Sequence, residues 1–489
     1  MIAALAFSEP TLRARLALSL LAGLLLAASY ALHPWWWAAW LAPVPLLLAL
    51  GRGPVRLIAV VAGVVSISSV LSYYLQIPGA WVTLMILLLR IASLMFVLRI
   101  VQLAVRRLPL ALAMLALPAG FAALEQLTLS VSVHGTAGSL AYSQMAVPAL
   151  VQAAALGGVP AVVFVLLLPG SLLGLWLSRP WPRTQRIGAV ATLGVLASAL
   201  ALFSAARMAP QAGMLRVTAI STDRFSTIPT DWPAVWAVYG RAIRQQAAAG
   251  ELVVLPEKIA LLDAPTAAIA ERDIQAAARD TGATLVLGVE VRDAQHYRNR
   301  AVVASPDGQL AWYDKQRLVP GMERRDSPGS TPLVTPVRAL ASGAETVLGI
   351  AICKDMHIPS IGRQYAGRTG VMAVPAWDFG RDGWMGARMA ALRAVENGYA
   401  IVRASRDGLL GAYDSAGRVI AEQPTDPDLA VLHATVPTAI RPTLYARFGD
   451  LFGWSCFAAV LLLRGIGLLG WIDKGDGANR QRSNSAPIF

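Results

Sequence analysis

The chain has few cysteines and few lysines for its length. Only two of its 489 residues are cysteine, Cys353 and Cys456, which excludes the disulfide framework of small secreted domains. Lysine occurs only four times among 42 basic residues, at Lys258, Lys315, Lys354 and Lys474. Because arginine is the default cation of this chain, a lysine at the end of a strand suggests a need for ammonium chemistry.

Charge is scarce as well. Charged residues make up 15% of the chain and hydrophobic residues 56%, which is too apolar for an ordinary soluble enzyme. The apolar residues gather in runs close to the ~20 residues that a helix needs to cross a bilayer. We therefore predict about eight membrane spans, and we expect the first to stay in place because no clean cleavage site follows it. The runs cover approximately residues 16–32, 36–50, 57–75, 81–105, 108–127, 159–177, 187–206 and 451–471.

The loops between these runs differ in charge. Arginine occurs in every second loop, at residues 13–15, 52–56, 106–107 and 179–186. The intervening loops, around residues 33 and 76 and over 130–158, contain no lysine or arginine. Since short basic loops stay in the cytosol, this alternation predicts a multi-pass membrane protein whose globular part lies outside the cytosol. These loops account for much of the net charge of +13, so we expect no nucleic-acid partner.

The composition changes to that of a globular domain at about residue 208. Short apolar strands alternate with amphipathic helices at first, and strands dominate later, which indicates a layered α/β domain. We predict a bundle of about seven transmembrane helices over 1–207 and an extracytoplasmic catalytic domain over 208–447. A closing span over 448–473 and a cytoplasmic tail over 474–489 complete the predicted organisation.

An acid, a lysine and a cysteine lie at the ends of three predicted strands. A thiol attacks as the thiolate and needs a base, which Glu257 can supply to Cys353. The ammonium group of Lys315 can stabilise the oxyanion of a tetrahedral intermediate, and Glu323 can orient that lysine. Each residue alone has a simpler explanation as core filler or surface charge, and only their coincidence favours catalysis. A rival arrangement pairs Cys353 with His357, but no third orienting group is evident.

These residues lie in stretches that resemble the carbon-nitrogen hydrolase, or nitrilase, superfamily and specifically its membrane branch, the apolipoprotein N-acyltransferases. The matching stretches are Leu255-Pro256-Glu257, Tyr313-Asp314-Lys315 with Glu323, Ile352-Cys353, and residues 392–404 with Asp414 and Gly417. The resemblance implies a membrane α-helical bundle of a bacterial inner membrane, joined to an α/β nitrilase-like αββα sandwich in the periplasm. It also implies that Glu257 is the general base, Lys315 the oxyanion-stabilising lysine and Cys353 the nucleophile, with Glu323 as an additional essential acid.

The activity that the resemblance implies is N-acyl transfer. A fatty acyl chain moves from a phospholipid, through a cysteine thioester, to the N-terminal amine of diacylglyceryl lipoproteins. The alternatives are a membrane-tethered carbon-nitrogen hydrolase or amidase, an acyltransferase with another amine acceptor, and a transporter or lipid-binding scaffold with a degenerate module. We expect a monomer without cofactor, and without metal because the histidines lack metal spacing.

Three positions depart from the family pattern. The family usually has Tyr-Glu after the position of Cys353, Phe-Gly before that of Glu323, and Gln-His shortly after that of Trp384. This chain has Lys354-Asp355, Gly321-Met322 and Met385-Gly386 at these places. The acceptor and the acyl chain preference therefore stay open. Lys354 adds a second ammonium group that can favour the thiolate or bind a lipid phosphate, unless it pairs with Asp355.

Some residues are candidate lipid contacts. A lateral opening for an acyl chain can be lined by Trp377, Phe379, Trp384 and Met385, although packing can explain one or two of them. Arg90 lies about 15 Å along its predicted helix, where ionised side chains usually face protein or water. It can bind a phospholipid head group, snorkel to the interface or pair with Glu125, and Arg464 lies similarly deep.

Overall fold

The computed structural model describes residues 9–51, 53–77, 79–293, 296–338 and 345–465. The contacts within the chain divide it into two compact units. The first consists of residues up to Leu127, Val159–Ala199 and residues from Asp450 onwards. The second consists of Thr128–Gly158 and Leu200–Gly449. Each unit is described by itself below.

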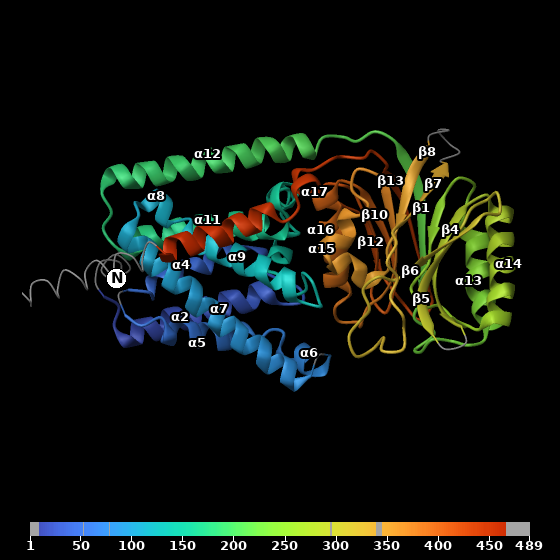
Figure 1. Cartoon of the computed structure of the whole chain (residues 1–489), viewed down its shortest axis with the longest axis horizontal. Helices are drawn as coiled ribbons and strands as arrows, with labels where there is room; N and C mark the ends of the chain where they lie inside the picture. The colour runs from blue at the N-terminus through green and yellow to red at the C-terminus, as the bar shows by residue number, and fades with distance from the viewer. Residues whose placement is uncertain (1–8, 52, 78, 294–295, 339–344, 466–489) are drawn as a thin grey trace, which may run out of the picture. The chain divides into compact units, whose positions relative to one another are not determined.

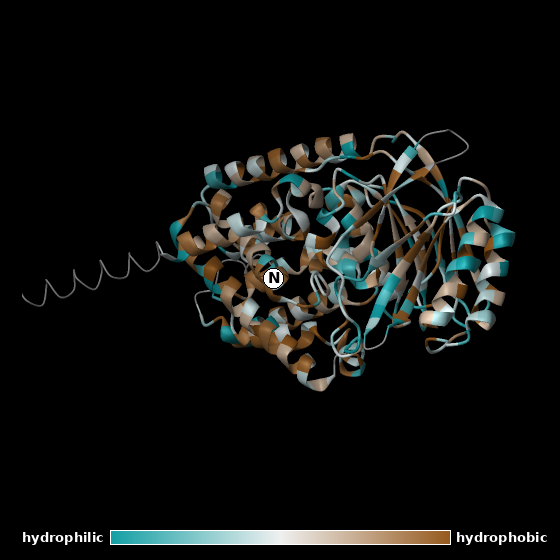
Figure 2. Ribbon diagram, turned by 45° about the vertical axis from the view of Figure 1, so that its right-hand side comes forward, coloured by the Kyte–Doolittle hydropathy of each residue, from teal (hydrophilic) through white to brown (hydrophobic). Residues whose placement is uncertain are grey.

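The first unit is built of apolar helices, whose ribbons are predominantly brown in Figure 2. Within the described residues, five helices are long and apolar enough to cross a membrane: α2 (Leu12–Tyr30), α7 (Ala80–Arg107), the stretch Leu110–Val131 with α8 (Leu110–Ala113) and α9 (Ala116–Val131), α11 (Ala154–Ser178), and α12 (Arg183–Arg207). Shorter apolar helices cover Trp36–Leu48, Arg56–Ser66 and Leu451–Gly465. Every predicted run thus coincides with an apolar helix, but the number of eight spans stays a prediction.

The shorter helices have local causes. Pro43 begins a new helix and separates α3 (Trp36–Leu41) from α4 (Pro43–Leu48), because proline cannot donate the next helical hydrogen bond. The predicted run 57–75 is divided between α5 (Arg56–Ser66) and α6 (Leu71–Gln76). In the break, the hydroxyl of Ser66 donates to Gly63 O at 2.8 Å and that of Ser69 to Ala27 O at 2.6 Å. Such side-chain bonds to the backbone compete with continued helix.

The second unit contains two β-sheets packed face to face (Figure 1). The strands of the larger sheet are β1 (Met214–Thr222), β2 (Leu252–Val254), β3 (Leu261–Leu262), β4 (Thr284–Arg292), β5 (Tyr297–Ala304), β6 (Leu310–Asp314) and β13 (Leu429–Pro437). Their order is β13-β1-β2-β4-β5-β6, with β3 beside β4. The strands of the smaller sheet are β7 (Leu333–Arg338), β8 (Glu345–Ile350), β9 (Val371–Trp377), β10 (Ala400–Arg406), β11 (Leu409–Tyr413) and β12 (Val419–Pro424). Their order is β12-β11-β10-β9-β8-β7.

Helices cover the outer faces of both sheets, which completes an αββα sandwich. The larger sheet packs against α13 (Trp232–Gln246) and α14 (Ala264–Thr281), and the smaller against α15 (Pro359–Arg363) and α16 (Gly383–Asn397), as Figure 1 shows. Asp231 and Asp263 cap α13 and α14 by accepting from backbone N–H groups of the first turn. Apolar side chains such as Val254, Ile350 and Val402 fill the space between the sheets. The predicted α/β nitrilase-like sandwich is confirmed.

The structure differs from the predicted strands at three places. The strand predicted up to Cys353 ends at Ile350, and Cys353 begins the 3₁₀ turn η2 (Cys353–His357). The short β3 and the edge strand β7 were not predicted, because β3 has two residues and β7 contains Pro336. Proline is tolerated at a sheet edge but weakens the sequence signal for a strand.

Residues 128–158 belong to the second unit, although the predicted domain boundary leaves them in the helical bundle. This segment includes η1 (Leu140–Gln144) and α10 (Pro148–Val151). The backbone N–H and hydroxyl of Thr136 both donate to His357 O at 3.0 Å, and the amide of Gln152 donates to Ala416 O at 2.8 Å. The predicted domain bounds stay predictions, and the tail 474–489 lies outside the described residues.

Candidate active site

The sheet topology brings Glu257 and Lys315 to one edge of the larger sheet. β2 and β4 are parallel, and β5 is antiparallel to both β4 and β6, so β2, β4 and β6 run in the same direction. Residues that follow these strands therefore meet at the same edge. Glu257 lies three residues after β2, and Lys315 directly follows β6. The ammonium group of Lys315 donates to Glu257 Oε1 at 2.7 Å.

Lys315 is held between two carboxylates. Its side chain is 1% exposed, and its Nζ also lies 3.0 Å from Glu323 Oε2. Burial by itself would lower the pKa of Lys315, but the charges of Glu257 and Glu323 outweigh burial and raise it well above its ordinary value. The lysine is therefore a fixed ammonium group, which suits it to stabilise negative charge and not to accept a proton.

A second buried ammonium group, that of Lys258, lies beside the first. Its Nζ is 2.9 Å from Glu290 Oε1, 2.7 Å from Asp326 Oδ2 and 3.2 Å from Glu323 Oε1. Lys258 was not among the predicted site residues, although a rare lysine directly after Glu257 is a signal for it. Among the described residues, no group of His, Cys, Asp and Glu is arranged to hold a metal ion. Ammonium groups occupy the centre of this carboxylate cluster.

Asn299 on β5 is another site residue that the sequence did not indicate. Its side-chain N–H group donates to both Glu257 Oε1 and Glu323 Oε1, and its backbone O accepts from Lys315 N at 2.8 Å. Burial by itself would raise the pKa of Glu323, but the charges of Lys315 and Lys258 outweigh burial and lower this pKa to about 2. Both acids are thus oriented by neutral and charged donors before any substrate binds.

Cys353 lies at the start of η2, where its backbone has a positive φ of 43°. Non-glycine residues rarely adopt this conformation, and where they do the strain is often found at functional sites. The thiol lies 3.6 Å from Trp377 O. Burial, reinforced by the charge of Glu257 and opposed by that of Lys315, raises the pKa of the Cys353 thiol above its ordinary value. The resting thiol is therefore protonated, and its attack requires a base.

Lys354 and Asp355 do not pair with each other, which corrects one predicted alternative. Lys354 Nζ donates to Leu318 O at 2.9 Å. Asp355 accepts from the Tyr313 hydroxyl at 2.8 Å and from Arg317 N at 2.8 Å, so it ties the turn of the cysteine to β6 and the loop after it. Burial, together with the charge of Lys315, lowers the pKa of Lys354 to about 8.

The rival pairing of Cys353 with His357 is not formed. Among the described residues, no hydrogen bond joins the imidazole of His357 to the thiol. Burial, followed by the charges of Arg403 and Lys354, lowers the pKa of His357 well below its ordinary value. The backbone of His357 instead accepts the two hydrogen bonds from Thr136.

The four residues predicted to line an opening for an acyl chain differ in position and exposure. Trp377 ends β9 beside the thiol, and its indole N–H donates to Asp407 Oδ2 at 2.7 Å. The loop that follows is anchored by a buried ion pair between Asp378 and Arg403. Phe379 in this loop is 36% exposed, whereas Trp384 and Met385 are half-buried at the start of α16.

Arg90 belongs to the first unit and not to the carboxylate cluster. Its guanidinium group donates to Ser66 O at 3.1 Å and lies 3.9 Å from the centre of the Tyr30 ring. The pairing of Arg90 with Glu125 stays a prediction, and Arg464 is exposed on the Leu451–Gly465 helix. A head-group role for Arg90 stays a prediction.

Known proteins match both parts of the chain. Residues 22–172 match the apolipoprotein N-acyltransferase N-terminal domain, and residues 208–439 match the carbon-nitrogen hydrolase domain. The apolipoprotein N-acyltransferase of Geobacter metallireducens is 28% identical over 91% of this chain and 94% of its own length. That of Pseudomonas putida is 28% identical over 67% of this chain and 68% of its own length.

Among solved structures, an amidase from Nesterenkonia sp. is 22% identical over 48% of this chain and 94% of its own chain, with a TM-score of 0.40. The two domain matches together cover most of the chain. The chain therefore belongs to the apolipoprotein N-acyltransferases, a branch of the carbon-nitrogen hydrolase superfamily.

Proposed function

We propose that this N-acyltransferase moves a fatty acyl chain from a phospholipid to the N-terminal amine of diacylglyceryl lipoproteins, through a thioester on Cys353. The observation that carries this proposal is the buried ion pair of Glu257 and Lys315 near the thiol. Glu257 N donates to Ala376 O at 3.2 Å, and the Cys353 thiol lies 3.6 Å from the carbonyl oxygen of the next residue, Trp377. The names of the relatives and the apolar helices support the lipid and lipoprotein substrates. Both substrates are amphiphiles, which gives a reason for joining a hydrolase-like sandwich to so many apolar helices.

In the first step, Glu257 accepts the proton of the Cys353 thiol while the sulfur attacks an ester carbonyl carbon of the phospholipid. The ammonium group of Lys315 stabilises the negative charge that develops on the carbonyl oxygen. When the tetrahedral intermediate collapses, the bond to the glycerol oxygen breaks, and Glu257 returns its proton to that oxygen. A lysophospholipid leaves, and the acyl group stays on sulfur as a thioester.

In the second step, the α-amine of the lipoprotein attacks the thioester carbonyl carbon. Glu257 accepts a proton from the attacking nitrogen, and Lys315 again stabilises the oxyanion. The carbon-sulfur bond breaks, an amide forms, and the sulfur regains its proton from Glu257. Glu323, Asn299 and Lys258 hold Glu257 and Lys315 in position without contacting the reacting atoms.

The side of the membrane on which the sandwich lies, and the residues that line the entry of the acyl chain, are part of the same proposal. The alternation of arginine between the loops supports a periplasmic sandwich on a bacterial inner membrane. Trp377, Phe379, Trp384 and Met385 are proposed to line the entry of the acyl chain, because Trp377 lies beside the thiol and the exposed Phe379 follows it. Asp355 is proposed to hold the nucleophile turn through its bonds to Tyr313 and Arg317.

The proposed reaction predicts a labelled amide product. Purified protein is incubated with a phospholipid that carries a labelled acyl chain and with a diacylated lipopeptide that has a free α-amine. We expect mass spectrometry to find the label on the lipopeptide nitrogen, and none on a control lipopeptide whose amine is acetylated. Expression of the chain in a strain depleted of its lipoprotein N-acyltransferase should restore growth. Label released only as free fatty acid would contradict acyl transfer.

A membrane-tethered amidase or an acyltransferase for another amine remains the second candidate. The observation that favours it is Lys354, a buried ammonium group at the residue after the nucleophile, where the family usually has tyrosine. Under this alternative, the labelled lipopeptide does not form. Small amides or other primary amines would then be consumed, with loss of turnover in the Cys353→Ala variant.

We predict that binding of the phospholipid donor depends on pH because of Lys354. We propose that its ammonium group attracts the phosphate of the phospholipid. Because the pKa of Lys354 is about 8, it is charged below that pH and loses its charge above it. The KM for the phospholipid is therefore expected to rise several-fold as the pH rises through 8, with a smaller change in kcat. Steady-state kinetics between pH 6 and pH 10 measure this effect.

Matched variants separate this role from a general effect of pH. Lys354→Arg keeps its charge over the whole range, so its KM should stay low and constant. Lys354→Met should have a high KM that does not change with pH. A wild-type KM that is constant through pH 8, with kcat changing in its place, would assign Lys354 to the thiol and not to the phosphate.

A further inference from the structure

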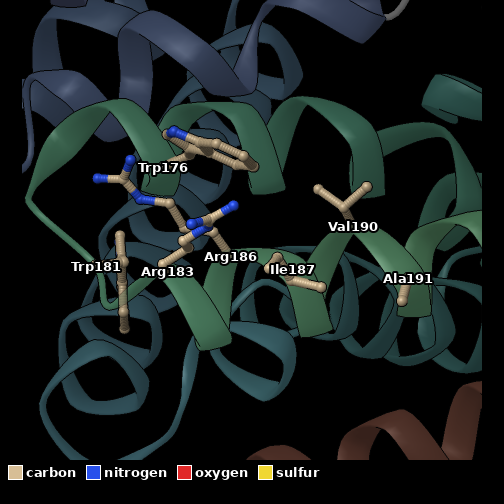
Figure 3. Close-up of a pocket in the computed structure, with 7 residues that line it drawn as sticks. All are labelled: Trp176, Trp181, Arg183, Arg186, Ile187, Val190 and Ala191. Atoms are coloured by element: carbon tan, nitrogen blue, oxygen red, sulfur yellow. The ribbon is translucent and has the colours of Figure 1, made fainter.

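The first unit contains an open groove where α11 ends and α12 begins (Figure 3). Its volume is about 780 Å³. Trp176 on α11 and Trp181 in the loop between the helices contribute the aromatic surface, and the first turns of α12 contribute the rest. No residue of this groove belongs to the catalytic sandwich.

One end of the groove is strongly basic. Arg183 and Arg186 both line it, and Figure 3 shows their guanidinium groups near Trp176. The guanidinium group of Arg186 lies 5.3 Å from the Trp176 ring centre, and its buried Nε has no hydrogen-bond partner. Residues 176–191 contain no acidic residue. Within the described part of the chain, neither arginine forms an ion pair, so no described residue neutralises the positive charge at this end.

The other end of the groove is aliphatic. Ile187, Val190 and Ala191 lie along α12 away from the two arginines, as Figure 3 shows. Ile187 is 59% exposed and Val190 is 48% exposed. The groove therefore has a cationic, aromatic end and an apolar end, which is the polarity of a phospholipid.

We propose that this groove binds an anionic phospholipid, with the phosphate on Arg183 and Arg186 and one acyl chain along Ile187, Val190 and Ala191. Charge complementarity favours an anionic head group over a zwitterionic one, because two unneutralised guanidinium groups meet it. A free phosphate would leave the apolar end uncovered. Tryptophan and arginine are also the residues that anchor helices at the membrane interface. This lipid is bound and not consumed, so its site is separate from that of the proposed acyl donor.

Native mass spectrometry of the full-length protein tests the proposal. The probes are dioleoylphosphatidylglycerol, dioleoylphosphatidylcholine and inorganic phosphate, each titrated against protein stripped of lipid. We expect one tightly bound phosphatidylglycerol and at least about tenfold weaker binding of phosphatidylcholine. Arg183→Gln with Arg186→Gln should weaken phosphatidylglycerol binding about thirtyfold, since each interfacial basic residue contributes ~1 kcal/mol.

Two further variants make the test specific. The double variant Arg13→Gln with Arg56→Gln removes the same charge from exposed positions outside the groove and should retain wild-type binding. Ala191→Trp keeps the charge but fills the apolar end, and it should weaken phosphatidylglycerol binding without making phosphatidylcholine bind better. Equal loss in both double variants would show general attraction to a basic surface, and undiminished binding in Arg183→Gln with Arg186→Gln would place the lipid elsewhere. Either result overturns the proposal.

Discussion

Replacing Cys353 with alanine is expected to abolish acyl transfer, with a fall in rate on the order of 10⁴-fold or more. The covalent intermediate requires the thiol, and Cys456, the other cysteine of the chain, lies on the Leu451–Gly465 helix of the first unit. Intact-protein mass spectrometry after incubation with phospholipid should show the mass of one acyl chain on the wild type. The Cys353→Ala variant should show none.

Two controls make this result interpretable. Cys456→Ala should retain both the adduct and the turnover, because the proposed chemistry does not involve it. Cys353→Ser tests the same point with a hydroxyl in place of the thiol, because it keeps a side chain of similar shape. An acyl adduct that persists in the alanine variant would show that another residue is acylated.

Glu257→Gln is expected to reduce acyl transfer by about 10²- to 10⁴-fold, the usual contribution of a general base. The same substitution should make the thiol of Cys353 ionise, and so react with an alkylating reagent, at a lower pH. Because the charge of Glu257 helps to raise the pKa of Cys353, its removal lowers that pKa towards its ordinary value. The rate of alkylation of Cys353 by iodoacetamide should therefore begin to rise at a lower pH than in the wild type.

A second buried glutamate provides the matched control. Glu251 lies just before β2, as Glu257 lies just after it, and Glu251 pairs with Arg216 on the neighbouring strand. Glu251→Gln should leave both turnover and the alkylation profile near wild-type values. If Glu257→Gln lowered turnover but left the pH profile of alkylation unchanged, Glu257 would act on the substrate and not on the thiol.

The sequence indicated that Glu257 and Lys315 lie near each other because strand periodicity is a local property. Glu257 and Lys315 follow short apolar strands, and side chains after parallel strands meet at one edge, so their proximity could be expected. Cys353 was predicted at the end of a strand, but the strand stops at Ile350. The turn conformation of Cys353 is set by the bonds of Asp355 to Tyr313 and Arg317, which are distant in sequence.

Other features could not be predicted because they depend on contacts between residues that are distant in sequence. Lys258 and Asn299 look like ordinary strand-end and strand residues, and only the sheet pairing places them against Glu257 and Glu323. The partner of Lys354 is a backbone carbonyl, which carries no sequence signal at all. Residues 128–158 have the composition of a membrane loop, yet hydrogen bonds from Thr136 and Gln152 join them to the sandwich unit.

The sequence by itself determined that apolar helices flank an α/β domain, and that an acid and a lysine follow two of its strands while a cysteine lies shortly after a third. Both follow from hydrophobic periodicity and residue type, which act over short distances along the chain. Tertiary structure alone decided which ammonium group meets which carboxylate, and that the thiol is held protonated. Burial and charge pairing depend on residues far apart in sequence, so these properties exist only in the folded protein.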